Sequence, residues 1–177
     1  MRKLGIHVGL VSVLLVALAA GSYALADGGK KEIKADQLVG YQENPDISTV
    51  ALGNFEARID DDAQTITFEL SYSGLEGTVQ QAHIHFGKRA VNGGVSVFLC
   101  TNVGGPAGIP ACPQSGTVTG ERGAVDVIGP TGQGIEAGAF GEIVTAIRAG
   151  HAYVNVHTTK WPGGEIRAQL NDQRDED

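Results

Sequence analysis

Short segments in which apolar and polar residues alternate constrain most strongly how this chain can fold. Phe55–Asp60 and Thr65–Tyr72 both alternate, and Asp61, Asp62 and Ala63 form a turn between them. Because strand side chains point to alternate faces, this arrangement predicts a β-hairpin. Glycine, at 26 of 177 residues, separates such segments, as expected for many strands joined by tight turns. Further strands are expected at residues 79–86, 95–100, 123–128, 152–158 and 165–170.

One segment, AFGEIVTAIRAG, departs from this alternation. Its apolar residues Phe140, Ile143, Val144 and Ile147 recur at the spacing of one helical face, and Gly150 is placed to end a helix. We expect a short amphipathic helix there. The predicted fold class is therefore mainly β, an antiparallel β-sandwich or barrel-like domain with one short helix.

The N-terminal segment has the pattern of a secretory signal peptide. Arg2 and Lys3 precede an apolar run at residues 4–20, and Ala24 and Ala26 are small residues in the pattern of a cleavage site. Export would place the protein outside the cytoplasm, secreted or in a periplasm or cell envelope. The apolar run is also long enough for an uncleaved membrane anchor, and that alternative stays open.

The domain division follows from this pattern. We predict a signal peptide at residues 1–26 and a single domain at 27–177, of which residues 171–177 form a charged tail. Without the first segment the chain keeps 11 basic and 20 acidic residues, a net charge of about −9. Such a surface repels nucleic acid and anionic lipid and attracts cations.

The chain has two cysteines, Cys100 and Cys112, which flank the loop NVGGPAGIP. Disulfides persist in the compartments that exported proteins reach, so we expect a bridge between these residues. Two free thiols are the alternative.

Polar side chains gather on one face of three predicted strands. In AHIHFG, His83 and His85 share one face, and the apolar neighbours share the other. The same test on AYVNVHT and GEIRAQL also places polar residues away from the core. The resulting set is His83, His85, Asn155, His157, Glu165 and Arg167. These side chains lie within reach of one another if the three strands are neighbours in one sheet.

Three histidines in this arrangement predict a metal site. Two imidazoles at i and i+2 can point at one ion, and His157 would add a third ligand to His83 and His85. Neutral imidazoles suit Zn²⁺ or Cu²⁺. His151 lies roughly 20 Å from His157 along an extended strand and is excluded from this site. The alternative is an exposed sheet face that simply carries polar residues.

Several ordered motifs resemble the CHRD domain, the module first named from chordin. They are AHIHFG, NGGVSVFL, RAGHAYVNVHT and PGGEIRAQL, together with LVGYQENPDISTVALGNFEARID upstream. The resemblance implies an extracytoplasmic β-rich domain in which the six polar residues above occupy recurring positions. The chain departs from the family at Ala168, where glycine is usual, and at His151. A weaker, local resemblance joins the His-x-His strand to the copper, zinc superoxide dismutases.

Three functions remain open at this point. The first is an exported CHRD-domain binding module that holds Zn or Cu through the three histidines, with Asn155, Glu165 and Arg167 around them as a supporting layer. The second is a metal-free protein-interaction or envelope-associated module with an extracytoplasmic protein partner. The third is a metal-dependent enzyme in which Glu165 would be the general base. In chordin the modules belong to an extracellular antagonist that binds growth factors, a partner that a single small exported domain need not share.

Overall fold

The described chain, which in this computed structural model is residues 31–35 and 37–172, contains nine strands. They are β1 (Lys31–Ala35), β2 (Leu38–Val39), β3 (Leu52–Asp60), β4 (Thr65–Ser73), β5 (Val79–Phe86), β6 (Gly94–Thr101), β7 (Gly116–Gly123), β8 (Ala152–Thr158) and β9 (Ile166–Asp172). One α-helix, α1 (Phe140–Arg148), and three 3₁₀ turns, η1 (Gly40–Gln42), η2 (Ala124–Asp126) and η3 (Thr131–Gln133), join them. The predicted signal peptide and residues 173–177 of the predicted tail lie outside the described residues.

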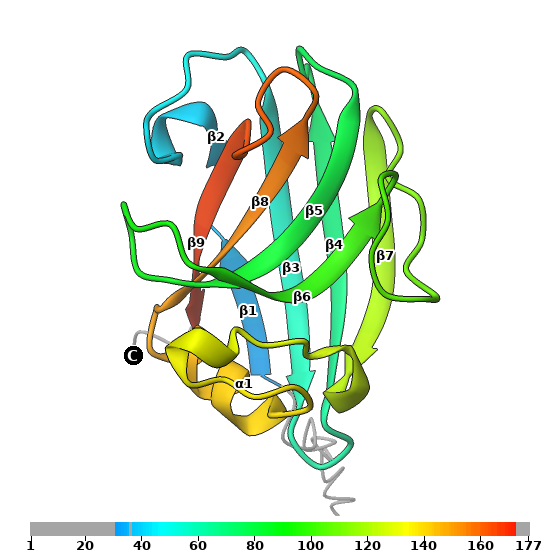
Figure 1. The fold of residues 1–177 in the computed structure, drawn as a ribbon, viewed down its shortest axis with the longest axis vertical. Coiled ribbons are helices and arrows are strands. Elements are labelled where there is room, and N and C mark those ends of the chain that lie inside the picture. The colour runs from blue at the N-terminus through cyan, green and yellow to red at the C-terminus, as the bar shows by residue number, and fades with distance from the viewer. Residues whose placement is uncertain (1–30, 36, 173–177) are drawn as a thin grey trace, which may run out of the picture.

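The strands form one antiparallel sheet in the order β6-β5-β8-β9-β1-β3-β4-β7, and β2 pairs with both β3 and β9. The sheet bends so that β5, β6 and β8 lie in front of β3, β4 and β7 (Figure 1). One hydrophobic core between these halves takes residues from both. The predicted fold class, mainly antiparallel β with one helix, is confirmed, and the arrangement is a sandwich.

The β3–β4 hairpin shows how the alternating pattern builds the core. Phe55 and Ile59 of β3 and Phe68 and Leu70 of β4 are buried, whereas the residues between them are largely exposed. Each buried side chain of this size stabilises the fold by about 1.5–3 kcal/mol relative to an exposed one. The two strands pair from Leu52 to Ser73 without a shift in register, as the sequence predicts.

The expected helix is present as α1 and closes one end of the sandwich (Figure 1). Its apolar face is buried against β8 and β9. Gly150 follows the helix with a φ of +70°, a conformation that glycine adopts at little cost. At the same end, Arg148 donates a hydrogen bond to Asp61 of the β3–β4 turn at 2.8 Å. No helix among the described residues is long and apolar enough to cross a membrane.

The prediction of a strand at residues 123–128 is wrong. This segment is mainly η2, and Val127 forms only an isolated bridge with Val97. The Asp126 carboxylate accepts a hydrogen bond from the backbone N–H of Gly123, which turns the chain out of the strand conformation. The actual strand, β7, precedes it, and its three glycines obscure the alternating pattern.

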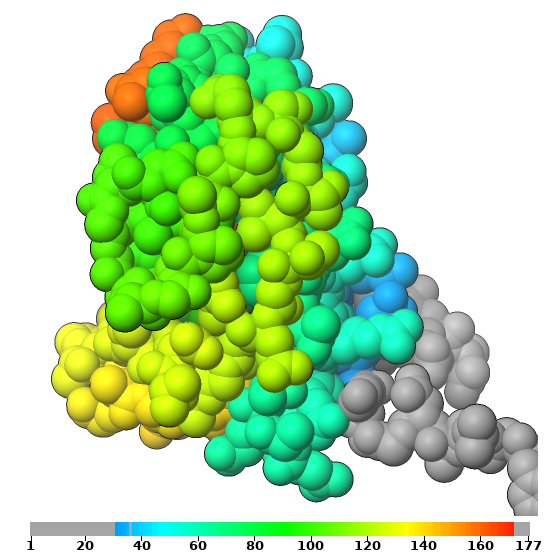
Figure 2. Space-filling model, turned by 90° about the vertical axis from the view of Figure 1, so that its right-hand side faces the viewer, coloured from blue at the N-terminus to red at the C-terminus, as the bar shows by residue number. Residues whose placement is uncertain are grey.

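The predicted bridge between Cys100 and Cys112 is confirmed and spans 12 residues of sequence. Within the loop, the Asn102 amide donates to the carbonyl of Cys112 and accepts from its N–H. Figure 2 shows the face that carries this loop and β7, with the segment from η2 to α1 beneath them. The loop is therefore held by side-chain hydrogen bonds as well as by the covalent bridge.

Arg122 lies where the two ends of the sheet approach each other. Its guanidinium, from β7, donates hydrogen bonds to the carbonyls of Phe98 at 2.7 Å and Leu99 at 2.9 Å, both in β6. The residue is buried, and its guanidinium also lies over the ring of Phe68. A side chain thus connects the two end strands of the sheet.

Candidate metal centre

The strands that carry the predicted site, β5, β8 and β9, are neighbours in the sheet. His83 of β5 lies opposite Asn155 of β8, which lies opposite Arg167 of β9. In the next row toward α1, His85, Tyr153 and Gln169 are aligned in the same way. The adjacency on which the site prediction depended is therefore present.

These side chains face away from the apolar core, yet they are buried. His83 is 2% exposed, His85 7% and Arg167 1%. The β5–β6 connection covers them: the Arg167 guanidinium donates to the carbonyls of Lys88 and Val91, and the Gln169 amide donates to that of Gly87. The alternative of an exposed polar sheet face does not hold for these residues. They form a second, polar interior layer on the outer side of the sheet.

His83, His85 and His157 form a compact group, which we call the triple-histidine cluster. Each offers one ring nitrogen, and these atoms all lie within 4.8 Å of one another. His83 Nδ1 lies 3.2 Å from His157 Nε2. His157 is partly exposed, so the cluster meets solvent on that side. An ion placed between the three rings would be within reach of every one of them.

Backbone carbonyls fix the orientation of two of these rings. His85 Nδ1 lies 3.0 Å from the carbonyl oxygen of Gly93, and His157 Nδ1 lies 2.9 Å from that of Pro162. Because a carbonyl oxygen only accepts, each Nδ1 carries the proton and each Nε2 keeps its lone pair. His85 Nε2 and His83 Nε2 are buried and have no hydrogen-bond partner among the described residues. This is the arrangement in which histidine binds metals in proteins.

Burial keeps the imidazoles neutral. Burial, with the neighbouring His157 and His85 acting in the same direction, lowers the pKa of His83 to about 2. Burial also lowers the pKa of His85 to about 4, although the Gly93 carbonyl opposes the shift. The pKa of His157 is lowered by burial as well. Neutral rings are the form that binds a metal ion, so protons offer little competition here.

Three further side chains pack around the cluster. The Phe98 ring meets His83 edge to face, with 4.3 Å between centroids, and the Tyr153 ring stacks on His85 at 4.8 Å. The Arg167 guanidinium carbon lies 3.3 Å from the centroid of the Tyr153 ring. The environment therefore combines apolar ring faces with one buried cation.

The predicted supporting residues differ in their positions. Asn155 lies in the row beside His83, and its Oδ1 is buried without a hydrogen-bond partner among the described residues. The Arg167 guanidinium lies over the ring of Tyr153, which in turn stacks on His85. Glu165 lies in a separate network, where its Oε1 accepts from the Thr49 hydroxyl and the Glu76 N–H, and its Oε2 accepts from the Thr158 hydroxyl.

Three residues of this layer lie outside the predicted set of site residues. The alternation rule places Tyr153 and Gln169 on the same face as Asn155 and Arg167, although neither is among the predicted site residues. Glu43 follows η1, where no periodic pattern exists. It is buried, and burial raises its pKa to about 7, although the charge of Arg167 opposes the shift.

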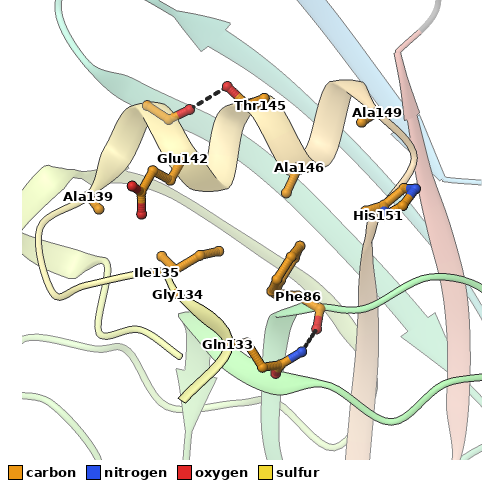
Figure 3. Close-up of a pocket in the computed structure, with 11 residues that line it drawn as sticks. Phe86, Gln133, Gly134, Ile135, Ala139, Glu142, Thr145, Ala146, Ala149 and His151 are labelled. Carbon is orange, nitrogen blue, oxygen red and sulfur yellow. Dashed lines mark hydrogen bonds between the residues drawn. The ribbon is translucent and has the colours of Figure 1, made fainter. Parts of the chain in front are cut away.

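His151 lies apart from the cluster, as expected. It is exposed at one end of a hollow of about 630 Å³ beneath α1 (Figure 3). Phe86 and Ile135 line the hollow opposite the helix, and Glu142 lies on the helix side. The Gln133 amide, which also lines it, donates to the carbonyl of Phe86. The hollow is largely apolar and shares no residue with the triple-histidine cluster.

A comparison with protein-family models tests the resemblance to the CHRD domain that the sequence motifs indicate. The family model of the CHRD domain matches residues 35–170. The chain belongs to the CHRD family. None of the curated proteins and none of the solved structures compared with the chain matches it. The matched range contains β2 to β8 and most of β9, so the triple-histidine cluster lies inside the CHRD domain.

Proposed function

We propose that this CHRD domain is an exported binding module that holds one transition-metal ion through His83, His85 and His157. The observation that carries the proposal is the fixed tautomer of two ligands. The Gly93 and Pro162 carbonyls each hold an Nδ1–H, which leaves His85 Nε2 and His157 Nε2 as lone-pair donors within one cluster. Neutral imidazole donors of this kind suit zinc or copper.

Burial supports the same function. A polar nitrogen without a partner in the interior costs about 1–3 kcal/mol, and two such atoms, His83 Nε2 and His85 Nε2, lie in this cluster. A bound ion would satisfy these atoms at once. The domain would therefore gain stability from the metal as well as hold it.

Export is supported by the N-terminal pattern and by the Cys100–Cys112 bridge, which requires an oxidising compartment to persist. An extracytoplasmic protein partner, not yet identified, is part of the same proposal.

The test is a binding titration of the purified chain without an affinity tag. Zn²⁺, Cu²⁺ and Cu⁺ are each titrated against a competing chelator, and bound metal is measured by elemental analysis. We expect close to one equivalent of zinc or copper and a rise in melting temperature. His85→Ala should abolish binding. His151→Ala is the matched control, because this histidine is exposed and outside the cluster.

A metal-free structural module is the second candidate, and one contact favours it. The 3.2 Å approach of His83 Nδ1 to His157 Nε2 is a hydrogen bond that can hold the rings together without an ion. Bound metal below one tenth of an equivalent, with an unchanged melting temperature, would support this candidate and reject metal binding. The protein partner would then be the question to pursue, by affinity capture from the native compartment.

A further inference from the structure

Tyr153 is linked to His85 directly, through a ring contact, and indirectly, through hydrogen bonds that both residues make to the backbone of Gly93. The two rings are stacked, with 4.8 Å between centroids and 6° between planes. The Tyr153 hydroxyl accepts a hydrogen bond from the Gly93 N–H at 3.1 Å. The carbonyl of the same Gly93 faces His85 Nδ1 at 3.0 Å. The hydroxyl therefore holds the residue that fixes the tautomer of His85.

Glycine is required at position 93 for this contact. A Cβ atom there would lie 1.7 Å from the carbonyl oxygen of Phe86 and 3.2 Å from the Cα of Gly87. The backbone of Gly93 thus passes so close to the end of β5 that no side chain fits. This close approach brings its carbonyl to the imidazole of His85.

Arg167 holds the other face of the tyrosine. Its guanidinium carbon lies 3.3 Å from the Tyr153 ring centroid, and its Nη2 donates to the carbonyls of Lys88 at 3.1 Å and Val91 at 3.0 Å. Arg167 is buried, so these contacts are made away from bulk water. One side chain thus secures both the ring that stacks on His85 and the loop that carries Gly93.

We propose that Tyr153 is a positioning residue for metal binding by His85. Its ring sets the plane of the imidazole, and its hydroxyl keeps the Gly93 carbonyl where it holds Nδ1–H, so that Nε2 points into the cluster. This inference rests on the proposed function. Partners that orient a metal-binding histidine commonly change metal affinity by about 10–100-fold when they are removed.

The decisive variant is Tyr153→Phe, which keeps the ring and removes only the hydroxyl. Tyr72→Phe is its matched control, because Tyr72 is also buried and its hydroxyl donates to the carbonyl of Pro113 at 2.8 Å, in another part of the fold. We expect Tyr153→Phe to weaken zinc or copper binding at least about tenfold. Tyr72→Phe should bind like the wild type, even if both variants lose similar stability.

Two spectroscopic measurements separate positioning from a general loss of stability. The electron paramagnetic resonance spectrum of bound Cu²⁺ should change in Tyr153→Phe and not in Tyr72→Phe. In the metal-free protein, the ¹⁵N chemical shifts of His85 should report a protonated Nδ1 in the wild type and a mixture of tautomers in Tyr153→Phe. This second measurement does not depend on metal.

The outcomes are distinct for the two proposals. If the wild type binds metal and Tyr153→Phe binds within twofold of it, with the same spectra and the same His85 tautomer, the positioning role is overturned while the metal site stands. If the wild type binds neither zinc nor copper, the proposed function fails, and the role of Tyr153 in metal binding fails with it.

Discussion

Substitutions of Glu165 test whether this buried acid stabilises the fold or takes part in metal binding. It is fully buried, and its carboxylate accepts hydrogen bonds from the Thr49 hydroxyl at 2.9 Å, the Glu76 N–H at 2.8 Å and the Thr158 hydroxyl at 2.7 Å. These donors belong to the segment before β3, the β4–β5 connection and β8. Glu165 therefore ties together three segments that are distant in sequence.

The cost of removing this carboxylate follows from its three donors. A hydrogen bond to a charged group contributes about 1.5–3 kcal/mol, and the two hydroxyls can turn toward other acceptors whereas the Glu76 N–H cannot. Glu165→Ala should lower the free energy of unfolding by about 4 kcal/mol. Glu165→Gln can keep one carbonyl oxygen facing Thr49 and Glu76, so it should cost only about 1–2 kcal/mol.

Urea denaturation of both variants measures these differences, and a titration with zinc or copper accompanies it. Metal affinity of Glu165→Gln should equal that of the wild type, because the carboxylate is engaged away from the histidines. Glu69→Gln, on the exposed face of β4, is the control and should change stability by less than about 0.5 kcal/mol. The reasoning is refuted if Glu165→Ala costs under about 1 kcal/mol, or if Glu165→Gln binds metal much more weakly.

Three further predictions concern the bridge and the pH dependence of the buried groups. Reduction of the Cys100–Cys112 bridge removes a constraint worth about 3 kcal/mol and should lower the melting temperature by roughly 10 °C in calorimetry; an unchanged melting temperature would contradict this. Burial raises the pKa of Glu43 from 4.5 to about 7, so its contribution to stability is complete below 4.5 and is lost as the pH rises through 7. The free energy of unfolding, measured with urea at pH 5 and at pH 8, should therefore fall less between these pH values in Glu43→Gln than in the wild type. An equal fall in both proteins would argue against a raised pKa for Glu43. Because burial lowers the pKa of all three histidines, metal affinity in a chelator competition should decline only at a pH below 6.5, and a decline through 6.5 would contradict this prediction.

The triple-histidine cluster was accessible to sequence reasoning because strand parity places His83 and His85 on one polar face and His157 on a similar face of another strand. That the two strands are neighbours was a condition of the prediction, not a result of it. Parity shows which face a side chain occupies, but it does not show what covers that face. The burial of the polar layer depends on the β5–β6 connection, which has no periodic pattern.

The parts of the site that come from loops were not predictable. The Gly93 and Pro162 carbonyls are backbone groups. Every residue type has such a carbonyl, so the sequence does not mark these two positions as partners of a histidine. Their positions come from a close packing contact at Gly93 and from the turn after β8. In the fold, the expected strand at 123–128 fails for a related reason: valine and isoleucine favour strands, but the hydrogen bond between Asp126 and Gly123 determines the local conformation.

The contact between Arg122 and β6 has a consequence for how this domain behaves at high concentration. A strand at the end of a sheet normally exposes carbonyl groups that an extended segment of another molecule can pair with, and this is a common start of aggregation. Here the Phe98 and Leu99 carbonyls already accept hydrogen bonds from a buried guanidinium. An incoming strand would have to displace a charged side chain from the interior before it could add to β6 at this point. Arg122 therefore acts as a gatekeeper against intermolecular strand addition.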